Sequence, residues 1–228
     1  MKQPIHWWRI FGVVLILLGS VSIIVPVVSS MASSSIHPFA TESHLNLIAK
    51  ANLNYKDINS PPHFLEAKPT QSAHYFAYIL AKAEGLNDAS LYILKSDHLA
   101  PKSIPKTVLD GAPGPNARIN PDFLNATLSF EFAANLPLNT PVTTTPLAWT
   151  RGLRPDGTWA PDSPWEGQGG HILFLDGHVE WFDRLKLNDP NGAYFYKYGT
   201  YTQTINIHEA LPPGAVILSA KPPHPAAP

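Results

Sequence analysis

Two histidines and a carboxylate with the chemistry of metal ligands stand within residues 169–182, whose sequence is GGHILFLDGHVEWF. Imidazole and carboxylate groups together suit zinc and similar metals, so His171, His178 and Glu180 are candidate ligands. Two β-prone runs separated only by Asp176-Gly177 predict a β-hairpin with a two-residue turn. The register of such a hairpin puts the three candidate side chains on one face.

The spacing within this hairpin also supports a structural interpretation. His171 and His178 would lie roughly 10 Å apart along the strand, at about 3.4 Å per residue. This separation favours a partly solvated polar face over a metal site. In that case Asp176 and Gly177 serve only to form the turn. The opposite face, wholly apolar, would carry Ile172, Phe174, Val179 and Trp181 into the core. We therefore expect no metal and no cofactor.

Acid–base catalysis has one further pair of candidates, Asp162 and Glu166, in the segment before the hairpin. A catalytic pair needs a cleft and separated pKa values, and the sequence indicates neither. The sequence contains no cysteine, nucleophile elbow, phosphate-binding loop or dinucleotide fingerprint. We expect no catalytic residues, and predict that the chain is not an enzyme.

Three tryptophans, Trp149, Trp159 and Trp165, precede the predicted hairpin and are candidate interaction residues. Tryptophan is enriched at binding hot spots, and aromatic side chains can serve as platforms for sugars. The alternative is that they pack in the core and at the edge of the sheet.

The elements that would position these residues follow from hydrophobic periodicity. A helix is predicted from Thr70 as its cap to Glu84, stopped by Gly85, and a shorter one from a Ser43 N-cap to about Lys56. Alternating or continuous apolar runs predict strands at 91–95, 128–132, 147–150, 194–201, 202–207 and 215–219. The fold class is therefore α+β, an antiparallel sheet packed on one or two helices.

The N-terminal segment differs from the rest of the chain. Residues 10–41 contain no charged side chain, and residues 10–28 are almost continuously apolar, about 28 Å of helix at 1.5 Å per residue. Lys2 and Arg9 precede this segment, which predicts a cytoplasmic N-terminus and an exported remainder. The alternative is a cleaved signal peptide processed within residues 29–35. We divide the chain into an anchor at 1–35, an extracytoplasmic α+β domain at 36–220 and a proline-rich tail at 221–228.

The amino-acid composition and net charge exclude some classes of function. With 24 Pro, 14 Gly and 14% charged residues, the chain is turn-rich and leans toward β structure. A net charge of −1 gives no basic patch of the kind that nucleic-acid binding requires. The expected partners are the lipid bilayer and other envelope proteins, with no nucleic acid.

The stretch GGHILFLDGHVEWF resembles the C-terminal His-X9-Asp-Gly signature of bacterial prepilin-type, pseudopilin-like proteins. Asp176, Gly177, His178 and Val179 match it, whereas Glu166 stands where the family has histidine. The resemblance implies a pilin-like fold, a single inner-membrane span and a periplasmic domain. It also implies a non-catalytic subunit of a secretion or pilus-type complex, such as type II secretion.

The apolar segment departs from the family's usual start. Gly12 is followed by Val13-Val14-Leu15 with no glutamate, so nothing there can neutralise a neighbour's N-terminal amine inside a bilayer. We therefore expect a minor or accessory subunit acting through assembly. The alternative function is a membrane-anchored glycan-binding or hydrolytic module that uses the three loop tryptophans.

Overall fold

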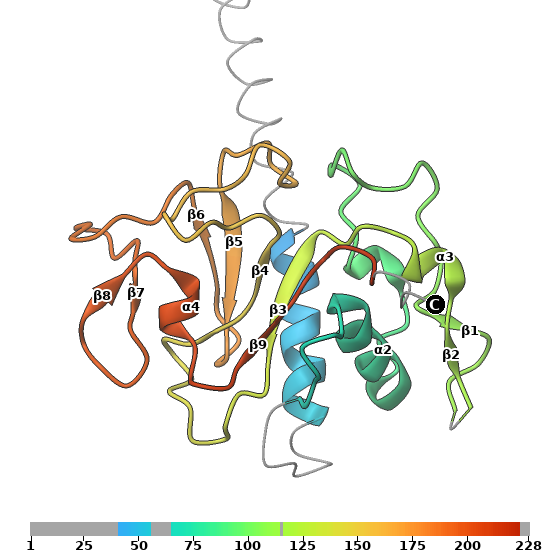
Figure 1. Cartoon of the computed structure of the whole chain (residues 1–228). Coiled ribbons are helices and arrows are strands. Elements are labelled where there is room, and N and C mark those ends of the chain that lie inside the picture. Colours follow the sequence, from blue (N-terminus) through green and yellow to red (C-terminus); the bar gives the residue numbers. More distant parts are fainter. Residues whose placement is uncertain (1–40, 56–64, 115, 224–228) are drawn as a thin grey trace, which may run out of the picture. The chain divides into compact units, whose positions relative to one another are not determined.

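The computed structural model describes residues 41–55, 65–114 and 116–223 (Figure 1). The chain divides into two units, Met1–Ala40 and Thr41–Pro228, and the second unit is an α+β domain. No helix among the described residues is long and apolar enough to cross a membrane. The predicted span at 10–28 and most of the predicted tail lie outside these residues.

A five-stranded antiparallel sheet forms the centre of the domain, in the order β6-β5-β4-β3-β9. Its strands are β3 (Phe130–Ala134), β4 (Pro146–Thr150), β5 (Gly170–Phe174), β6 (Val179–Phe182) and β9 (Val216–Leu218). The prediction of an antiparallel α+β fold is therefore confirmed. The sequence also correctly predicted β4, β5, and β9 as an edge strand.

Burial differs between the middle and the edge of this sheet. Every residue of the central strands β4 and β5 is buried, which explains why both strands are apolar on both faces. The edge strand β6 exposes Glu180 and Trp181 and buries only Phe182 fully. Both faces of β4 and β5 are therefore covered by other parts of the domain.

The helix α2 (Ala73–Glu84) covers part of the sheet. Phe76 stacks on Phe132 of β3 with ring centroids 4.3 Å apart, and Leu80 is fully buried. Gly85 ends the helix in the left-handed conformation, as predicted, but the N-cap is Ser72, two residues after the predicted Thr70.

Residues 41–55 form a second helix, drawn in blue in Figure 1. The sequence predicts an apolar stripe of Leu45, Ile48, Ala49 and Leu53 on this helix. The first three are buried, and Leu53 is half-buried. Ser43 lies inside the helix, so the prediction that it caps the N-terminus is wrong.

The strand predicted at residues 91–95 is absent. A short 3₁₀ helix, η1 (Ala89–Leu91), begins there because the side chain of Asp88 accepts a hydrogen bond from the Ser90 N–H. The Leu94 N–H then donates to the hydroxyl of Ser129 at 2.9 Å. Local caps and loop bonds therefore use backbone groups that a strand would need.

The remaining elements are short. β1 (Leu109–Asp110) pairs with β2 (Arg118–Ile119) within residues 101–121, whose Pro, Gly and Asn content predicts a loop. α3 (Pro121–Leu124) follows them. β7 (Phe195–Tyr196) pairs with β8 (Gln203–Thr204), and α4 (Ile207–Ala210) follows. The two strands predicted at 194–207 therefore shrink to two residues each.

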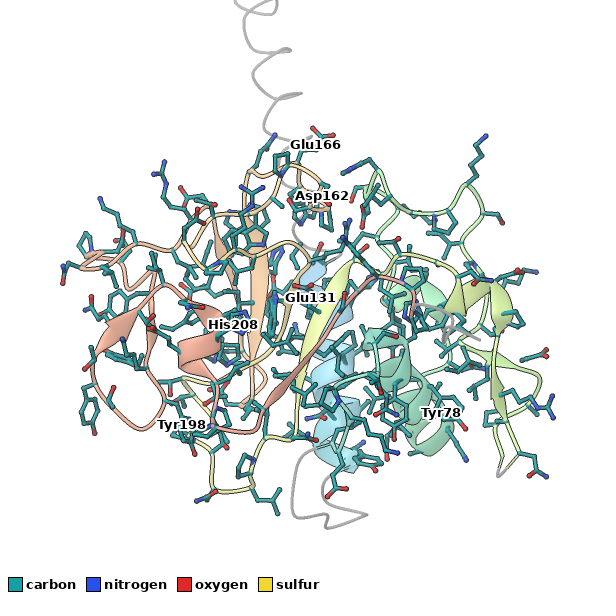
Figure 2. All side chains as sticks on the ribbon, viewed as in Figure 1. Tyr78, Glu131, Asp162, Glu166, Tyr198 and His208 are labelled. Carbon is teal, nitrogen blue, oxygen red and sulfur yellow. The ribbon has the colours of Figure 1, made fainter. Side chains whose placement is uncertain are left out.

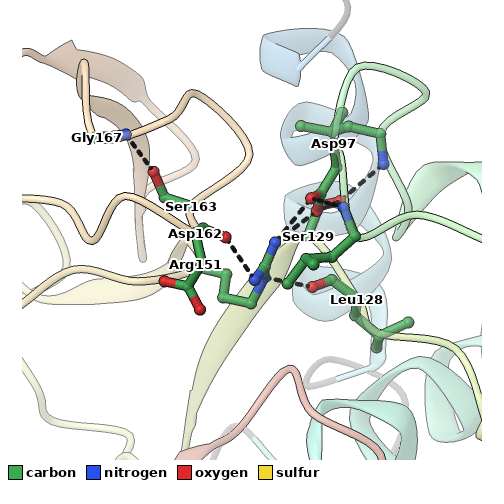
Figure 3. A network of polar contacts seen from close by, with 9 residues as sticks. Asp97, Leu128, Ser129, Arg151, Asp162, Ser163 and Gly167 are labelled. Atoms are coloured by element: carbon green, nitrogen blue, oxygen red, sulfur yellow. Dashed lines mark hydrogen bonds and ion pairs between the residues drawn. The ribbon is translucent and has the colours of Figure 1, made fainter.

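A buried ion pair fastens the loops to the sheet (Figure 3). Arg151 Nη2 contacts both carboxylate oxygens of Asp97, at 2.8 and 2.9 Å, and the Ser129 hydroxyl donates to the same carboxylate. Arg151 Nε donates to the carbonyl of Leu128, and Nη1 to that of Asp162. One guanidinium group thus ties three loop segments together away from water.

Candidate functional site

The turn of the β5–β6 hairpin has three residues, not the predicted two. The N–H of Gly177 donates to the carbonyl of Phe174, and the N–H of Phe174 donates to the carbonyl of His178. Gly177 has a φ of +94°, whereas Asp176 has no positive φ, so the turn is a type I turn followed by a bulged glycine. Asp176 accepts a hydrogen bond from the N–H of His178 and thereby stabilises this turn.

The extra turn residue shifts the register by one position. His171 pairs with Trp181, Ile172 with Glu180 and Leu173 with Val179. A shift of one residue changes which side chains share a face. The predicted apolar face of Ile172, Phe174, Val179 and Trp181 therefore does not exist.

The three metal-ligand candidates do not converge. His171 lies on one face, where its ring contacts Trp181 at 4.9 Å, while His178 and Glu180 lie on the other. His171 is buried, and burial lowers its pKa to about 4. Within the described ranges, no three histidine, aspartate or glutamate side chains are grouped closely enough to hold a metal ion.

Two of the three candidate tryptophans are core residues. Trp149 is buried and donates from Nε1 to Glu131 at 3.0 Å. Burial raises the pKa of Glu131, and the hydrogen bond from Trp149 opposes that shift. Trp159 is buried over Gly170 and donates to the carbonyl of Thr150, while half-buried Trp165 packs edge-to-face on Trp181.

The acid–base candidates are residues of an exposed loop (Figure 2). Asp162 and Glu166 both have exposed side chains, and Glu166 adopts a positive φ of 52° within a turn. The main chain of Asp162, not its carboxylate, contacts Arg151. The structure places the two residues where they shape the loop between β4 and β5.

A different site, missed at the sequence level, lies beside the polar face of the hairpin. Two pockets, of about 210 and 460 Å³, share Thr143, Thr144 and Tyr196 in their walls. The smaller is also lined by Phe174, His178, Glu180 and Tyr194, and the larger by Thr145, Tyr198 and Tyr201. We call the two pockets together the tyrosine groove.

The hairpin contributes an oriented imidazole to this groove. His178 Nδ1 lies 2.6 Å from the carboxylate of Asp176, and its ring stacks on Phe174 at 4.3 Å with the planes nearly parallel. Because Asp176 engages Nδ1, Nε2 is the nitrogen left to meet a ligand. The Asp-Gly-His motif therefore builds both the turn and one wall of the groove.

Another part of the lining is a row of tyrosines in β7 and in the residues on either side of it. Tyr196 packs edge-to-face against Tyr194 at 5.6 Å and against Tyr201 at 6.4 Å. Tyr201 is 95% exposed. A side-chain hydrogen bond with Tyr194 raises the pKa of Tyr196, and the electrostatic interaction with the same Tyr194 raises it further. The alternation of Tyr194, Tyr196 and Tyr198 was visible in the sequence, but it predicted only a strand.

Searches against protein-family models, curated proteins and solved structures return no match.

The tyrosine wall is held in place by Glu209, which belongs to α4. Its carboxylate accepts hydrogen bonds from Thr204 at 2.6 Å and from Lys197 at 3.1 Å, and both contacts lower its pKa. Its carbonyl accepts from the N–H of Tyr198. Lys197, which also lines the groove, is therefore neutralised by an internal partner. The groove offers a ligand aromatic rings, hydroxyl groups, one imidazole and the carboxylate of Glu180.

A third pocket, of about 470 Å³, lies between residues 66–75 and Pro213-Gly214. Tyr75, Lys68 and Asn135 line it, and Asn135 bonds residue 67 through both its amide oxygen and nitrogen. Glu66, on its rim, follows closely on residues 56–64, which lie outside the described ranges. A further pocket, of about 500 Å³, is lined by Lys95, Asp97 and Lys102. Among these pockets, the tyrosine groove is the one that contains the candidate residues His178 and Glu180.

Proposed function

We propose that this chain is a non-catalytic, pseudopilin-like envelope protein that acts by assembly. Residues 10–28 would span the inner membrane once, with the N-terminus in the cytoplasm and the α+β domain in the periplasm. Lys2 and Arg9 before the apolar segment support this orientation. The expected partners are lipids and other subunits of a secretion or pilus-type complex.

The observation that carries the proposal is the 41–55 helix. It follows the apolar segment in the sequence, and it places Leu45 and Ile48 in the core shared with the sheet. The domain therefore begins with a helix that is packed into its own core. This agrees with a single anchor that leads into an α+β domain.

The Asp-Gly turn supports the same proposal by its position. A side chain added at Gly177 would meet the Cβ of Ala49, on the 41–55 helix, at 3.8 Å. The tip of the hairpin is also bonded to the preceding loop, from Leu175 N–H to Thr145 and from Asp176 N–H to Val142. The turn of this motif therefore lies beside the 41–55 helix.

The buried polar groups of the domain serve structure, which fits a protein that works through its surface. Asp97 is occupied by Arg151 and Ser129, and Glu131 by Trp149. His74 bridges Ser72 and the carbonyl of Ala126, at 3.0 and 2.8 Å. Each of these charged or ionisable groups holds two segments of the chain together.

A minor or accessory role follows from the apolar segment. Residues 10–41 hold no carboxylate, so a neighbouring subunit's N-terminal amine would remain an uncompensated charge in the bilayer. A subunit of this kind is expected to join a complex built by others. Assembly would then depend on helix packing in the membrane and on domain contacts outside it, where small residues such as Gly19 permit close approach.

The tryptophan version of the glycan-binding alternative has little support. Trp149 and Trp159 are buried and hydrogen-bonded within the domain, so neither can present a face to a sugar. Trp165 is half-buried against Trp181. A hydrolytic module would additionally need an acid–base pair, and Asp162 and Glu166 lie in an exposed loop.

Native extraction from membranes tests assembly directly. The tagged full-length chain, expressed at native level, should leave mild detergent extracts in a particle larger than one chain, with the same envelope proteins by mass spectrometry in each detergent. The matched control exchanges residues 1–35 for a cleavable export signal, and it should release the domain as a monomer. Recovery of the full-length chain only as a monomer across several detergents would refute the proposal.

A further inference from the structure

The tyrosine groove carries an exposed aromatic surface that core packing does not explain. Tyr201 is 95% exposed, yet it is in edge-to-face contact with Tyr196, which in turn contacts Tyr194. Successive rings stand at 87° and 81° to each other, so the row presents alternating faces and edges. Tyrosine combines a flat apolar body with a polar tip, which suits ligands that are themselves amphipathic.

Hydroxyl groups form another part of the lining. Thr143 and Thr144 line the larger pocket, exposed and half-buried respectively, next to the buried Thr145. The Thr200 hydroxyl, in the turn beside Tyr201, already donates to the carbonyl of Lys197 and accepts from the N–H of Thr202. A hydroxyl group both donates and accepts hydrogen bonds, so this part of the lining matches a ligand whose own groups do the same. Sugar rings have that chemistry, with C–H groups on the ring faces and hydroxyls around the rim.

The charges around the larger pocket are balanced inside the protein. Lys197 is the charged residue in its wall, and its ammonium group lies 3.1 Å from Glu209. A ligand therefore meets no free cation or anion there, which disfavours phosphates and acidic peptides. The adjoining smaller pocket adds His178 and Glu180, whose imidazole and carboxylate can bind further hydroxyl groups.

The size and rigidity of the site fit a small ligand. A volume of about 460 Å³ lies within the range of about 300–1,000 Å³ typical of small-molecule sites. The tyrosine turn is fixed by Glu209 through Lys197 and Tyr198, so less ordering is needed on binding. A protein partner would instead need roughly 800 Å² of surface on each side.

We infer that the tyrosine groove is a binding site for a short neutral carbohydrate chain. The sugar faces pack on Tyr196 and Tyr201, and the sugar hydroxyls bond to the hydroxyls of Thr143 and Thr144. The smaller pocket, with His178 held by Asp176, receives the next unit of the chain. This site is separate from the tryptophans and goes beyond the proposed assembly function.

The test titrates the purified full-length chain with neutral tetrasaccharides. Chitotetraose, cellotetraose, maltotetraose and mannotetraose are added in a detergent without a sugar headgroup, because alkyl glycosides would compete. Calorimetry should show binding of at least one of them. Tyr196→Ala and Tyr201→Ala should each weaken that binding roughly three- to tenfold, as expected for loss of one aromatic contact. Tyr201→Phe keeps the ring and should retain affinity within about twofold.

Tyr75→Ala is the matched control, since Tyr75 is a half-buried tyrosine in the wall of a different pocket. It should leave binding unchanged, and circular dichroism should show that every variant is folded. The inference is overturned if none of the four sugars binds at millimolar concentration, if neither groove variant weakens binding, or if Tyr75→Ala abolishes it. Selection of a peptide ligand from a displayed library, lost in Tyr201→Ala while no sugar binds, would assign the groove to a protein partner and also overturn it. None of these results depends on the assembly partners.

Discussion

At the scale of single residues, the Arg151–Asp97 pair shows how the domain holds its loops. The two side chains are 5% and 0% exposed and make bidentate contact, whereas Lys197 and Glu209 pair with both side chains more than 40% exposed. A buried charge without its partner is strongly destabilising, while an exposed pair contributes little because water and salt screen it. Burial, not the number of ion pairs, decides which one matters for stability.

We therefore predict that Asp97→Ala lowers the free energy of unfolding by about 3–5 kcal/mol, because it leaves Arg151 buried and unpaired. Lys197→Ala is the exposed control and should change it by less than about 1 kcal/mol. Urea unfolding of the full-length chain, followed by tryptophan fluorescence, measures both. A double variant with Arg151→Met should lose less than the sum of the single losses, and strict additivity would contradict a coupled pair.

Two buried histidines make the domain sensitive to acid. Burial lowers the pKa of both His74 and His171 to about 4 from an ordinary 6.5. Between these values the unfolded chain binds protons that the folded chain does not, so the unfolding free energy falls as the pH falls from 6.5 toward 4. Each histidine accounts for roughly 3 kcal/mol across that window, at 1.36 kcal/mol per pKa unit.

His171→Phe should reduce this pH dependence, since phenylalanine fills the site beside Trp181 without titrating. Urea unfolding at pH 7.5, 5.5 and 4.5 measures the slope of stability against pH. His208→Gln, which alters an exposed ring, controls for the loss of a histidine in itself. A slope as steep in His171→Phe as in the parent chain would show that His171 does not carry the effect.

At the scale of elements, the sequence predicted the helices and strands that depend on local patterns. It did not predict the hairpin register, which depends on contacts between distant residues. The helix ending at Gly85 and the strands β4 and β5 follow from periodicity and turn chemistry. The hairpin register does not, because Asp176-Gly177 fits both a two-residue turn and a three-residue turn with a bulged glycine. The bonds from Leu175 to Thr145 and from Asp176 to Val142 accompany the longer turn, and neither partner could be known from the hairpin alone.

The candidate site was missed for the same reason. His178 and Glu180 were singled out by residue type, but their neighbours in the groove are Thr143 and Tyr194, from segments far apart in the sequence. The spacing of the tyrosines can be read from the sequence, but the threonines that line the same pocket cannot be identified from it. The one-residue shift in register then moved His171 away from the other two candidates.

The hairpin glycines give a prediction at this scale. Gly170→Ala should cost about 3 kcal/mol, because the new Cβ would lie 2.6 Å from Trp159 and 2.8 Å from Thr150. Gly177→Ala should cost about 1 kcal/mol, because its nearest neighbour would be 3.8 Å away and only the positive φ resists the change. Thermal unfolding of both variants measures the difference. Equal losses, or a larger loss at Gly177, would contradict the packing of Trp159 over Gly170.

At the scale of the whole molecule, the proposed function requires the described domain to lie on the far side of the membrane from residues Met1 to Arg9. The central sheet of the described domain is antiparallel, and the 41–55 helix packs in its core. The larger pocket of the tyrosine groove is lined by residues between Pro141 and Ala210. Under the assembly proposal, the partners of the domain reach it in the periplasm. Orientation is therefore a property on which the assembly proposal depends.

Trypsin added to intact spheroplasts tests that orientation, because the domain carries exposed lysines in a loop. Lys102 and Lys106 have exposed side chains in the irregular stretch between η1 and β1. Lys106 is the more restrained of the two, because its carbonyl accepts a hydrogen bond from the N–H of Ala89. We expect cleavage there without lysis, leaving a C-terminal fragment that begins at Ser103 or Thr107, while a cytoplasmic marker protein stays intact. The Lys102→Gln, Lys106→Gln double variant should lose this cut. Protection of the loop until the membrane is broken, with cleavage at these lysines after lysis, would place the domain in the cytoplasm and refute the topology.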